Sequence, residues 1–280
     1  MNQSHSIDIT GGSSNEQFWS RAFKYVTAKL DGHILEITLN RPELYNALHG
    51  PAHYELHDIF DEYERDRNLW VAILTGAGDK AFCAGNDLKA TNEGGDTKPA
   101  PSGFGGICSR WGREKPVIAA VNGVAMGGGC EIVLACDIAV ADEKAKFALP
   151  EVKVGLFAAA GGVQRLTRQI GRKAAMELVL TGRQINAVRA CELGIVSRVA
   201  GEGETALGIA RAIAHEITMA SPVSVRASKR VLNYLEEKVE KFPDSFEVNA
   251  KELLNVLNSH DGKEGVRAFV EKRAPKWTNS

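Results

Sequence analysis

The hydrophobic pattern alternates between short apolar runs and amphipathic stretches. Residues 33–40 place their side chains alternately on two faces before Arg41-Pro42 ends the segment, which predicts a strand followed by a turn. Runs at 70–75, 117–121 and 138–141 are apolar throughout and stop at glycine, asparagine or aspartate. Such continuous runs are typical of strands that are buried on both faces of a largely parallel sheet.

Helical spacing follows the first strand and dominates the last third of the chain. Apolar residues at 52, 56, 59, 60 and 63 recur on one helical face, and Pro51 suits the first turn of that helix. A further helix is expected after the three glycines at 127–129. Beyond about residue 195 the pattern predicts helices, over 205–220, 223–235, 246–257 and 262–271.

This order predicts an α/β protein built from repeated ββα or βα units with a helical C-terminal region. We divide the chain into a flexible N-terminal tail at 1–22, a ββα core at 23–200 and a helical region at 201–280. Residues 89–101 are poor in apolar side chains and rich in glycine, proline and asparagine. A mobile loop near functional residues is expected there.

Charge and targeting signals narrow the class of protein. Lys and Arg total 34 and Asp and Glu 35 among 280 residues, a formal net charge of −1. Dedicated nucleic-acid binders carry a basic excess, so no nucleic-acid partner is expected. No apolar run approaches the ~18 residues of a membrane span, and the polar N-terminus has no signal-peptide pattern. We therefore expect a cytoplasmic protein without a membrane partner.

Three motifs suggest chemistry but favour a simpler interpretation. The segment 76–81 fits G-x-G-x-x-A, yet no helical periodicity follows it, so a turn is favoured over a dinucleotide site. His49, His53 and His57 are four apart, but Gly50-Pro51 puts His49 outside the helix; a solvated helix face is favoured and no metal is expected. The five cysteines contain no CxxC pair, which predicts reduced, mostly buried thiols, Cys130 included.

Two acidic residues stand out from the rest of the chain. Glu131 follows the glycines at 127–129, and Glu151 follows Pro150. A carboxyl just inside an apolar helix is screened from water, which raises its pKa toward neutral and suits proton transfer. Each glutamate alone is also explained as a helix N-terminal residue that interacts with the dipole. Sequence physics does not place the two side by side.

Several motifs in one order resemble the signature of the enoyl-CoA hydratase/isomerase (crotonase) superfamily, and most closely its hydratases. They lie at 81–88, 115–123, 127–131, 136–137, 147–151 and 161–166, and weaker similarity extends from Leu35 to Lys272. The resemblance implies a crotonase (ClpP/crotonase-like) fold, a ββα superhelix whose C-terminal helices assemble a homotrimer or a dimer of trimers. It also implies an acyl-CoA thioester as substrate, with no metal and no other cofactor.

The resemblance further implies a role for particular residues. The backbone N–H groups of Asn86 and Gly128 match the oxyanion hole, Glu131 matches the base that activates water, and Glu151 matches the group that exchanges a proton with C2. Asn86 stands where alanine is common in hydratases. Positions that match substrate or CoA contacts are Ala84, Asp87, Leu88, Ala159, Phe269 and Lys272, the last two contributed by a neighbouring subunit.

The expected reaction is the reversible hydration of trans-2-enoyl-CoA to 3-hydroxyacyl-CoA, because both glutamates are present. One departure concerns the turn after Glu151, where hydratases usually carry Pro-Gly and this chain has Phe157-Ala158-Ala159-Ala160. Methyl groups there, beside a bulky phenylalanine, are able to shift the water or reshape the acyl pocket. An isomerase is therefore an alternative. A crotonobetainyl-CoA-type hydratase is another, because residues 102–106 and 147–151 resemble that branch of the superfamily. An RNA-binding homologue is disfavoured by the balanced charge.

Overall fold

The computed structural model describes residues 17–87, 90, 94–96, 98–154, 156–237, 255 and 258–280, without the side chains of 235–237, 266, 269 and 270. Most of the expected N-terminal tail and, apart from Asn255, the expected helix 246–257 therefore lie outside the described residues. The expected loop 89–101 is described only in part.

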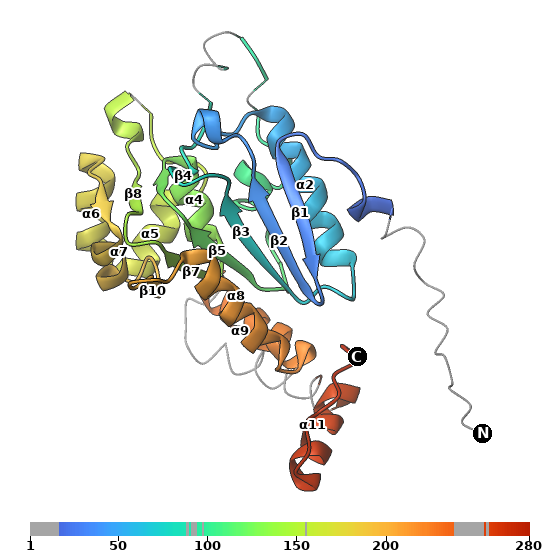
Figure 1. The fold of residues 1–280 in the computed structure, drawn as a ribbon. Helices are drawn as coiled ribbons and strands as arrows, with labels where there is room; N and C mark the ends of the chain where they lie inside the picture. The colour runs from blue at the N-terminus through green and yellow to red at the C-terminus, as the bar shows by residue number, and fades with distance from the viewer. Residues whose placement is uncertain are drawn as a thin grey trace.

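A six-stranded sheet forms the larger part of the core (Figure 1). Its order is β1-β2-β3-β5-β7-β10, and every pairing except the antiparallel β1–β2 ladder is parallel. The strands are β1 Val26–Asp31, β2 Ile34–Leu39, β3 Val71–Gly76, β5 Val117–Val121, β7 Ile138–Ala141 and β10 Arg198–Val199. The four strands expected from the hydrophobic pattern are β2, β3, β5 and β7, so the prediction of a largely parallel, buried sheet is confirmed.

A second sheet of four short strands was not anticipated from the hydrophobic pattern. Its order is β4-β6-β8-β9, with β4, β6 and β8 parallel and β9 antiparallel to β8. The strands are β4 Ala81–Cys83, β6 Val124–Met126, β8 Lys146–Ala148 and β9 Ile185–Asn186. With two or three residues each, they contain too few side chains to display an alternation.

Helices occur between the strands and at the end of the chain. The α-helices are α2 Gly50–Arg65, α4 Gly128–Ala135, α5 Gly162–Ile170, α6 Arg172–Thr181, α7 Ala187–Leu193, α8 Ala206–Thr218, α9 Pro222–Glu237 and α11 His260–Glu271. The 3-10 helices are η1 Pro42–Leu44, η2 Phe104–Gly106 and η3 Glu151–Val154. The helices expected at 52–63, after 127–129, and at 205–220, 223–235 and 262–271 are confirmed. None of the described helices is long and apolar enough to cross a membrane.

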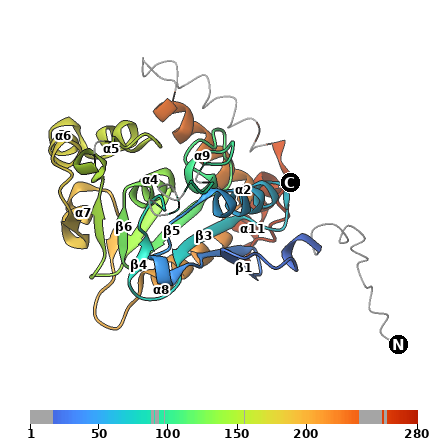
Figure 2. The same cartoon turned by 90° about the horizontal axis from the view of Figure 1, so that it is seen from above.

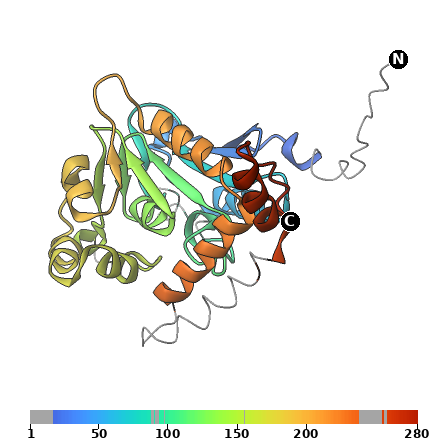
Figure 3. The same ribbon diagram turned by 90° about the horizontal axis from the view of Figure 1, so that it is seen from below.

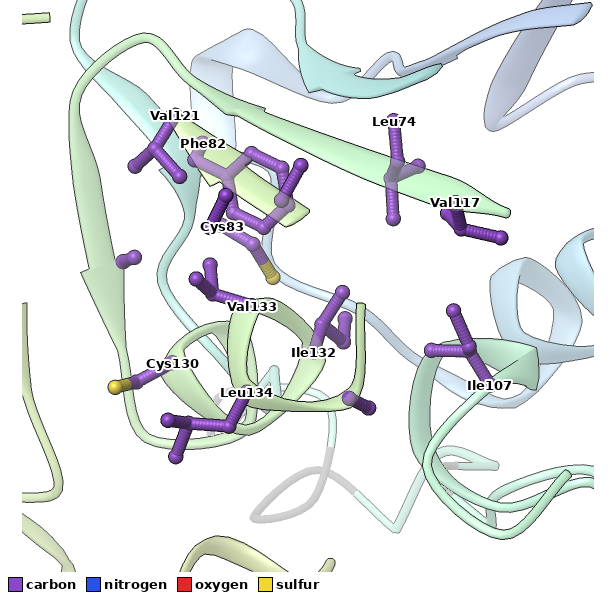
Figure 4. Close-up of a cluster of buried hydrophobic side chains, with 14 of the residues drawn as sticks. Leu74, Phe82, Cys83, Ile107, Val117, Val121, Cys130, Ile132, Val133 and Leu134 are labelled. Atoms are coloured by element: carbon purple, nitrogen blue, oxygen red, sulfur yellow. The ribbon is translucent and has the colours of Figure 1, made fainter. Parts of the chain in front are cut away.

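Both faces of the large sheet are buried, which explains why its strands are apolar throughout. Val71 and Ile73 of β3 face α8, whereas Ala72 and Leu74 face the side covered by α2 and α4. Figure 2 shows α8 on one side of β3 and β5 and the other two helices opposite. Figure 4 shows side chains of α4 directed toward β4, so this helix packs between the two sheets.

The C-terminal helices extend from the core on the α8 side. Helix α11 packs on α9, as Figure 3 shows. Asn279 binds the following segment to the core, because its amide nitrogen donates to the carbonyl of Arg67. The assignment of residues 201–280 to trimerisation, and the boundaries at residues 22 and 200, stay predictions.

Candidate active site

Three neighbouring parallel strands end at one edge of the small sheet, and a candidate residue follows each of them. Asn86 follows β4, Gly128 follows β6, and Glu151 follows β8. Because the carboxyl ends of parallel strands lie at the same edge, these residues are brought together from positions far apart in sequence. Ligands of α/β proteins bind at such edges. The small sheet therefore assembles the site.

The segments that carry Asn86 and Gly128 are in direct contact. Gly85 has φ +93°, and a Cβ built on it would lie 2.8 Å from the Met126 carbonyl oxygen and 3.1 Å from the Gly128 nitrogen. Only glycine allows this close approach. Gly128 is the first residue of α4, so its N–H belongs to the turn that has no intrahelical acceptor.

The backbone around Asn86 is oriented by Leu48. The Leu48 N–H donates to the Gly85 carbonyl and the Asp87 N–H donates to the Leu48 carbonyl, each at 2.8 Å. Consecutive N–H groups of an extended segment point to opposite sides. The Asn86 N–H is therefore directed away from Leu48.

Glu131 lies in the first turn of α4 and is 3% exposed. Its Oε1 accepts a hydrogen bond from the Gly162 N–H at 2.8 Å. The pKa of Glu131 is raised to about 7, chiefly by burial and also by the Glu151 carboxylate, against the lowering effects of the Gly162 and Ala160 N–H groups and of Arg165. The pKa expected from the sequence for a screened carboxyl is thus borne out in direction, and the two carboxyls lie within electrostatic reach.

Glu151 opens η3 and is partly exposed. Burial raises the pKa of this carboxyl also. Its Oε2 atom is buried and has no hydrogen-bond partner among the described residues. An unpartnered carboxylate oxygen in a partly open site is suited to accept a proton from a bound molecule.

Two glycines make room for the two carboxyl groups. A Cβ on Gly127 would lie 3.2 Å from Glu151 Oε1, and a Cβ on Gly162 would lie 3.0 Å from Glu131 Oε1. Gly127 also has φ +53°, where other residues are strained. The local sequence gives no signal for this role of Gly127 beside Glu151.

The other candidate positions divide into near and distant ones. Ala84 and Asp87 flank Gly85-Asn86, and the Asp87 carboxylate is paired with Arg41 at 2.9 Å. Ala159 is exposed in the turn that precedes Gly162. Leu88 lies outside the described residues, as does the side chain of Phe269. Lys272 is exposed and directly follows α11.

The interpretation of the histidines needs correction. His49 is the N-cap of α2, outside the helix as expected, but His53 is fully buried rather than part of a solvated face. His57 is partly buried and its Nδ1 lies 2.7 Å from the Ser102 hydroxyl. No cluster of three or more His, Cys, Asp or Glu side chains able to hold a metal occurs in the described part of the chain.

The cysteines are free thiols in the structure, which agrees with the sequence reading. Cys83, Cys108 and Cys130 are buried, and Cys136 and Cys191 are partly so. Burial raises the pKa of the Cys130 thiol above its usual value. A thiol that resists ionisation is a poor nucleophile, so Cys130 serves packing.

Arg165 is a residue of the site that the sequence reading did not single out. Its guanidinium donates to the carbonyls of Ala160 at 3.3 Å and Cys108 at 2.8 Å, and it lies over the Trp111 ring. These bonds hold the turn that faces Glu131. The same turn forms one wall of a cavity of about 930 Å³, which neither carboxyl lines. Asn86 and Gly128 do not line this cavity either.

Comparison with known proteins identifies the wider group. The family model described as enoyl-CoA hydratase/isomerase matches residues 29–280. A mevalonyl-coenzyme A hydratase of Beauveria bassiana is 41% identical over 260 residues, which cover 89% of this chain and 92% of that protein. The carnitinyl-CoA dehydratase of Escherichia coli K12 is 41% identical over 251 residues, 88% of this chain and 95% of that protein.

Solved structures give the same result. An enoyl-CoA hydratase from Mycobacterium tuberculosis H37Rv has a TM-score of 0.86 and 42% identity, covering 91% of this chain and 99% of that chain. A carnitinyl-CoA hydratase from Mycobacterium avium has a TM-score of 0.73 and 41% identity, covering 92% of this chain and 100% of that chain. The crotonase fold expected from the sequence is confirmed.

Proposed function

The chain belongs to the enoyl-CoA hydratase/isomerase family, and from this premise we propose that it is a hydro-lyase that adds water reversibly to trans-2-enoyl-CoA. Relatives that carry hydratase and dehydratase names support this reaction class. The structural observation that carries the proposal is the pair of electrostatically coupled carboxyls, Glu131 buried and Glu151 partly exposed, beside two backbone N–H groups.

In the proposed reaction the thioester oxygen binds between the N–H groups of Asn86 and Gly128. As water adds at C3, negative charge moves from the C2–C3 double bond to this oxygen, where the two fixed dipoles stabilise it. One such donor contributes roughly 3–4 kcal/mol in comparable sites. Because only backbone groups are used, an asparagine at position 86 is compatible with the role.

Glu131 is proposed as the base that removes a proton from the attacking water. A base is most effective when its pKa lies near the working pH, and a pKa of about 7 meets that condition. Glu151 is proposed to deliver the proton that C2 gains. The water oxygen thus bonds to C3, one proton ends on C2, and neither step needs a cofactor.

The turn at 157–160 bears on the alternatives raised by the sequence. Ala158 is buried, and its Cβ lies 3.0 Å from the Cβ position of Gly162. Phe157 is 65% exposed. We propose that the Ala160 and Gly162 N–H groups keep Glu131 oriented in place of a Pro-Gly turn, so that hydration persists. The isomerase is the alternative.

For the substrate we propose only a class of acyl group, and for the assembly only an oligomeric state. Relatives named for mevalonyl-CoA and carnitinyl-CoA favour a short, polar acyl group on coenzyme A. The remaining proposals follow the family resemblance: a homotrimer or dimer of trimers in the cytoplasm, with Leu88, Ala84, Asp87 and Ala159 near the substrate. Phe269 and Lys272 would contact the CoA of a neighbouring subunit.

The decisive experiment compares wild type and Glu131→Gln on 2-enoyl-CoA and 3-enoyl-CoA esters, with polar and apolar acyl groups. Wild type should hydrate 2-enoyl-CoA, and the variant should lose at least 10²-fold of that rate, the scale of a general base. The matched control is Glu143→Gln, a glutamate in the turn before β8. Negligible hydration by wild type together with robust 3-enoyl turnover by the Glu131 variant would establish the isomerase instead.

A further inference from the structure

We propose that His53 is a positioning residue of this site, which holds the Phe104 ring against Gly128 and thereby fixes the Gly128 N–H. The inference rests on the proposed function of that N–H as an oxyanion donor. No motif of the family resemblance includes His53. The contacts that carry it run from α2 through η2 to the first residue of α4.

The first contact joins His53 to the η2 segment. His53 is fully buried in α2, and its Nδ1 accepts a hydrogen bond from the Gly105 N–H at 3.0 Å. Since Nδ1 is the acceptor, the ring proton is on Nε2, which has no hydrogen-bond partner among the described residues. Burial of a leucine at this position would cost less free energy, because leucine has no polar atom left without a hydrogen bond. The imidazole is therefore present for the bond it makes.

The second contact joins Phe104 to the histidine ring and to Gly128. The two rings meet edge to face, with centroids 4.5 Å apart. A Cβ on Gly128 would lie 2.4 Å from Phe104 Cε1 and Cζ, so the phenyl ring lies directly on the Gly128 backbone. Gly128 is a glycine because the ring occupies the place of its side chain.

The third contact lies between η2 and α4. Gly105 has φ +62°, and a Cβ on it would lie 2.5 Å from Ile132 Cδ1, one turn along α4 from Gly128. Residues 104 and 105 are thus held between α2 and α4. The hydrogen bond from the Gly105 N–H to His53 Nδ1 fixes the position of residues 104 and 105 between the two helices. It thereby fixes the position of the Phe104 ring against Gly128.

The protonation state of His53 suits this role. The pKa of His53 is lowered to about 4, chiefly by burial and also by the nearby His49, against the raising effect of Asp96. At neutral pH the ring is uncharged and Nδ1 remains an acceptor. A protonated ring would donate at Nδ1 and oppose the Gly105 N–H.

The experiment compares four proteins: wild type, His53→Leu, His53→Asn and His57→Asn. Leucine removes the acceptor, whereas the Oδ1 atom of asparagine lies near the position of Nδ1 and can accept from Gly105. His57→Asn is the matched control, because His57 lies one turn further along α2 and bonds to Ser102 and Arg110 instead. Folding of each variant is checked by thermal unfolding and by its oligomeric state.

Two rates are measured: hydration of 2-enoyl-CoA, and exchange of the C2 proton of a saturated acyl-CoA in D₂O. Both need the oxyanion donors, but exchange needs no attack by water. His53→Leu should lower kcat for both by the same factor, about 10- to 100-fold, with the Kd of free CoA unchanged within twofold. His53→Asn should recover most of both rates, and His57→Asn should stay within threefold of wild type.

The outcomes separate this inference from the proposed function. If a folded His53→Leu variant keeps both rates, or if hydration falls while exchange does not, the positioning role is wrong. If His53→Leu does not fold, the inference is decided by Phe104→Leu, which must slow both rates equally. If wild type exchanges the C2 proton but hydrates no substrate, the proposed reaction fails while the role of His53 is still measured by exchange.

Discussion

Glu131→Gln should make the protein more stable at alkaline pH while it abolishes hydration. Burial raises the pKa of Glu131 from 4.5 to about 7, so the native state favours the protonated form. The stabilisation from this group is fully present below the unfolded pKa of 4.5 and is lost as the pH rises through about 7. Wild type therefore holds a destabilising carboxylate at the pH where the proposed base, Glu131, must be ionised.

The magnitude follows from the two pKa values. A difference between 4.5 and about 7 corresponds to about 3 kcal/mol, at about 1.4 kcal/mol per pH unit. Because Glu131 is 3% exposed, solvent screening reduces this little. Glutamine stays neutral and its Oε1 can still accept from the Gly162 N–H. The variant should gain about 2–3 kcal/mol on wild type between pH 5 and pH 8.

Urea unfolding at matched protein concentrations measures this difference at pH 5, 6, 7 and 8. Concentrations must match because the stability of an oligomer depends on them. The quantity of interest is the difference in unfolding free energy between the two proteins as a function of pH. If that difference is flat from pH 5 to pH 8, the pKa of Glu131 is ordinary and the reasoning is refuted.

Three further outcomes are expected. In Gly162→Ala the new Cβ would lie 3.0 Å from Glu131 Oε1. The variant should displace the carboxylate by a few tenths of an ångström and lower kcat three- to tenfold. An unchanged kcat would show that displacement of the Glu131 carboxylate does not affect the reaction. Glu151→Gln should retain the fold and CoA binding but lose 10²–10⁴ of turnover, and wild-type rates in the folded variant would reject its assignment. Relative to His53→Asn, wild type should lose up to about 3 kcal/mol of stability as the pH falls from 6.5 toward 4, because the pKa of His53 is lowered on folding; parallel pH curves in urea unfolding would contradict this.

The hydrophobic pattern predicts the large sheet and most of its helices but not the sheet that assembles the site. Strands such as β3 and β5 are five or six residues long and buried on both faces, so their apolar runs are visible. β4, β6 and β8 have three residues each. Their pairing depends on contacts between segments about 20 to 40 residues apart, which local pattern does not carry.

The carboxyl pair shows the same limit. Burial and a raised pKa for Glu131 follow from its apolar neighbours in the sequence, whereas its proximity to Glu151 was implied only by the family resemblance. The prediction that His53 lies on a solvated face was wrong, because three histidines at helical spacing (49, 53 and 57) look like the polar face of a helix. Its partner, Gly105, lies 52 residues away and gives no local signal.

The proposed use of backbone N–H groups at positions 86 and 128 has a consequence for how such enzymes diversify. A main-chain N–H donor is retained when the side chain is changed, provided that the backbone conformation at Gly85 and Gly127 stays the same. Under the proposed function, exchange of the Asn86 side chain is expected to alter the acyl group that is accepted while both proposed donors are kept. Position 86 is where a new substrate preference should first be sought by selection or by saturation mutagenesis, while the glycines around it are left untouched.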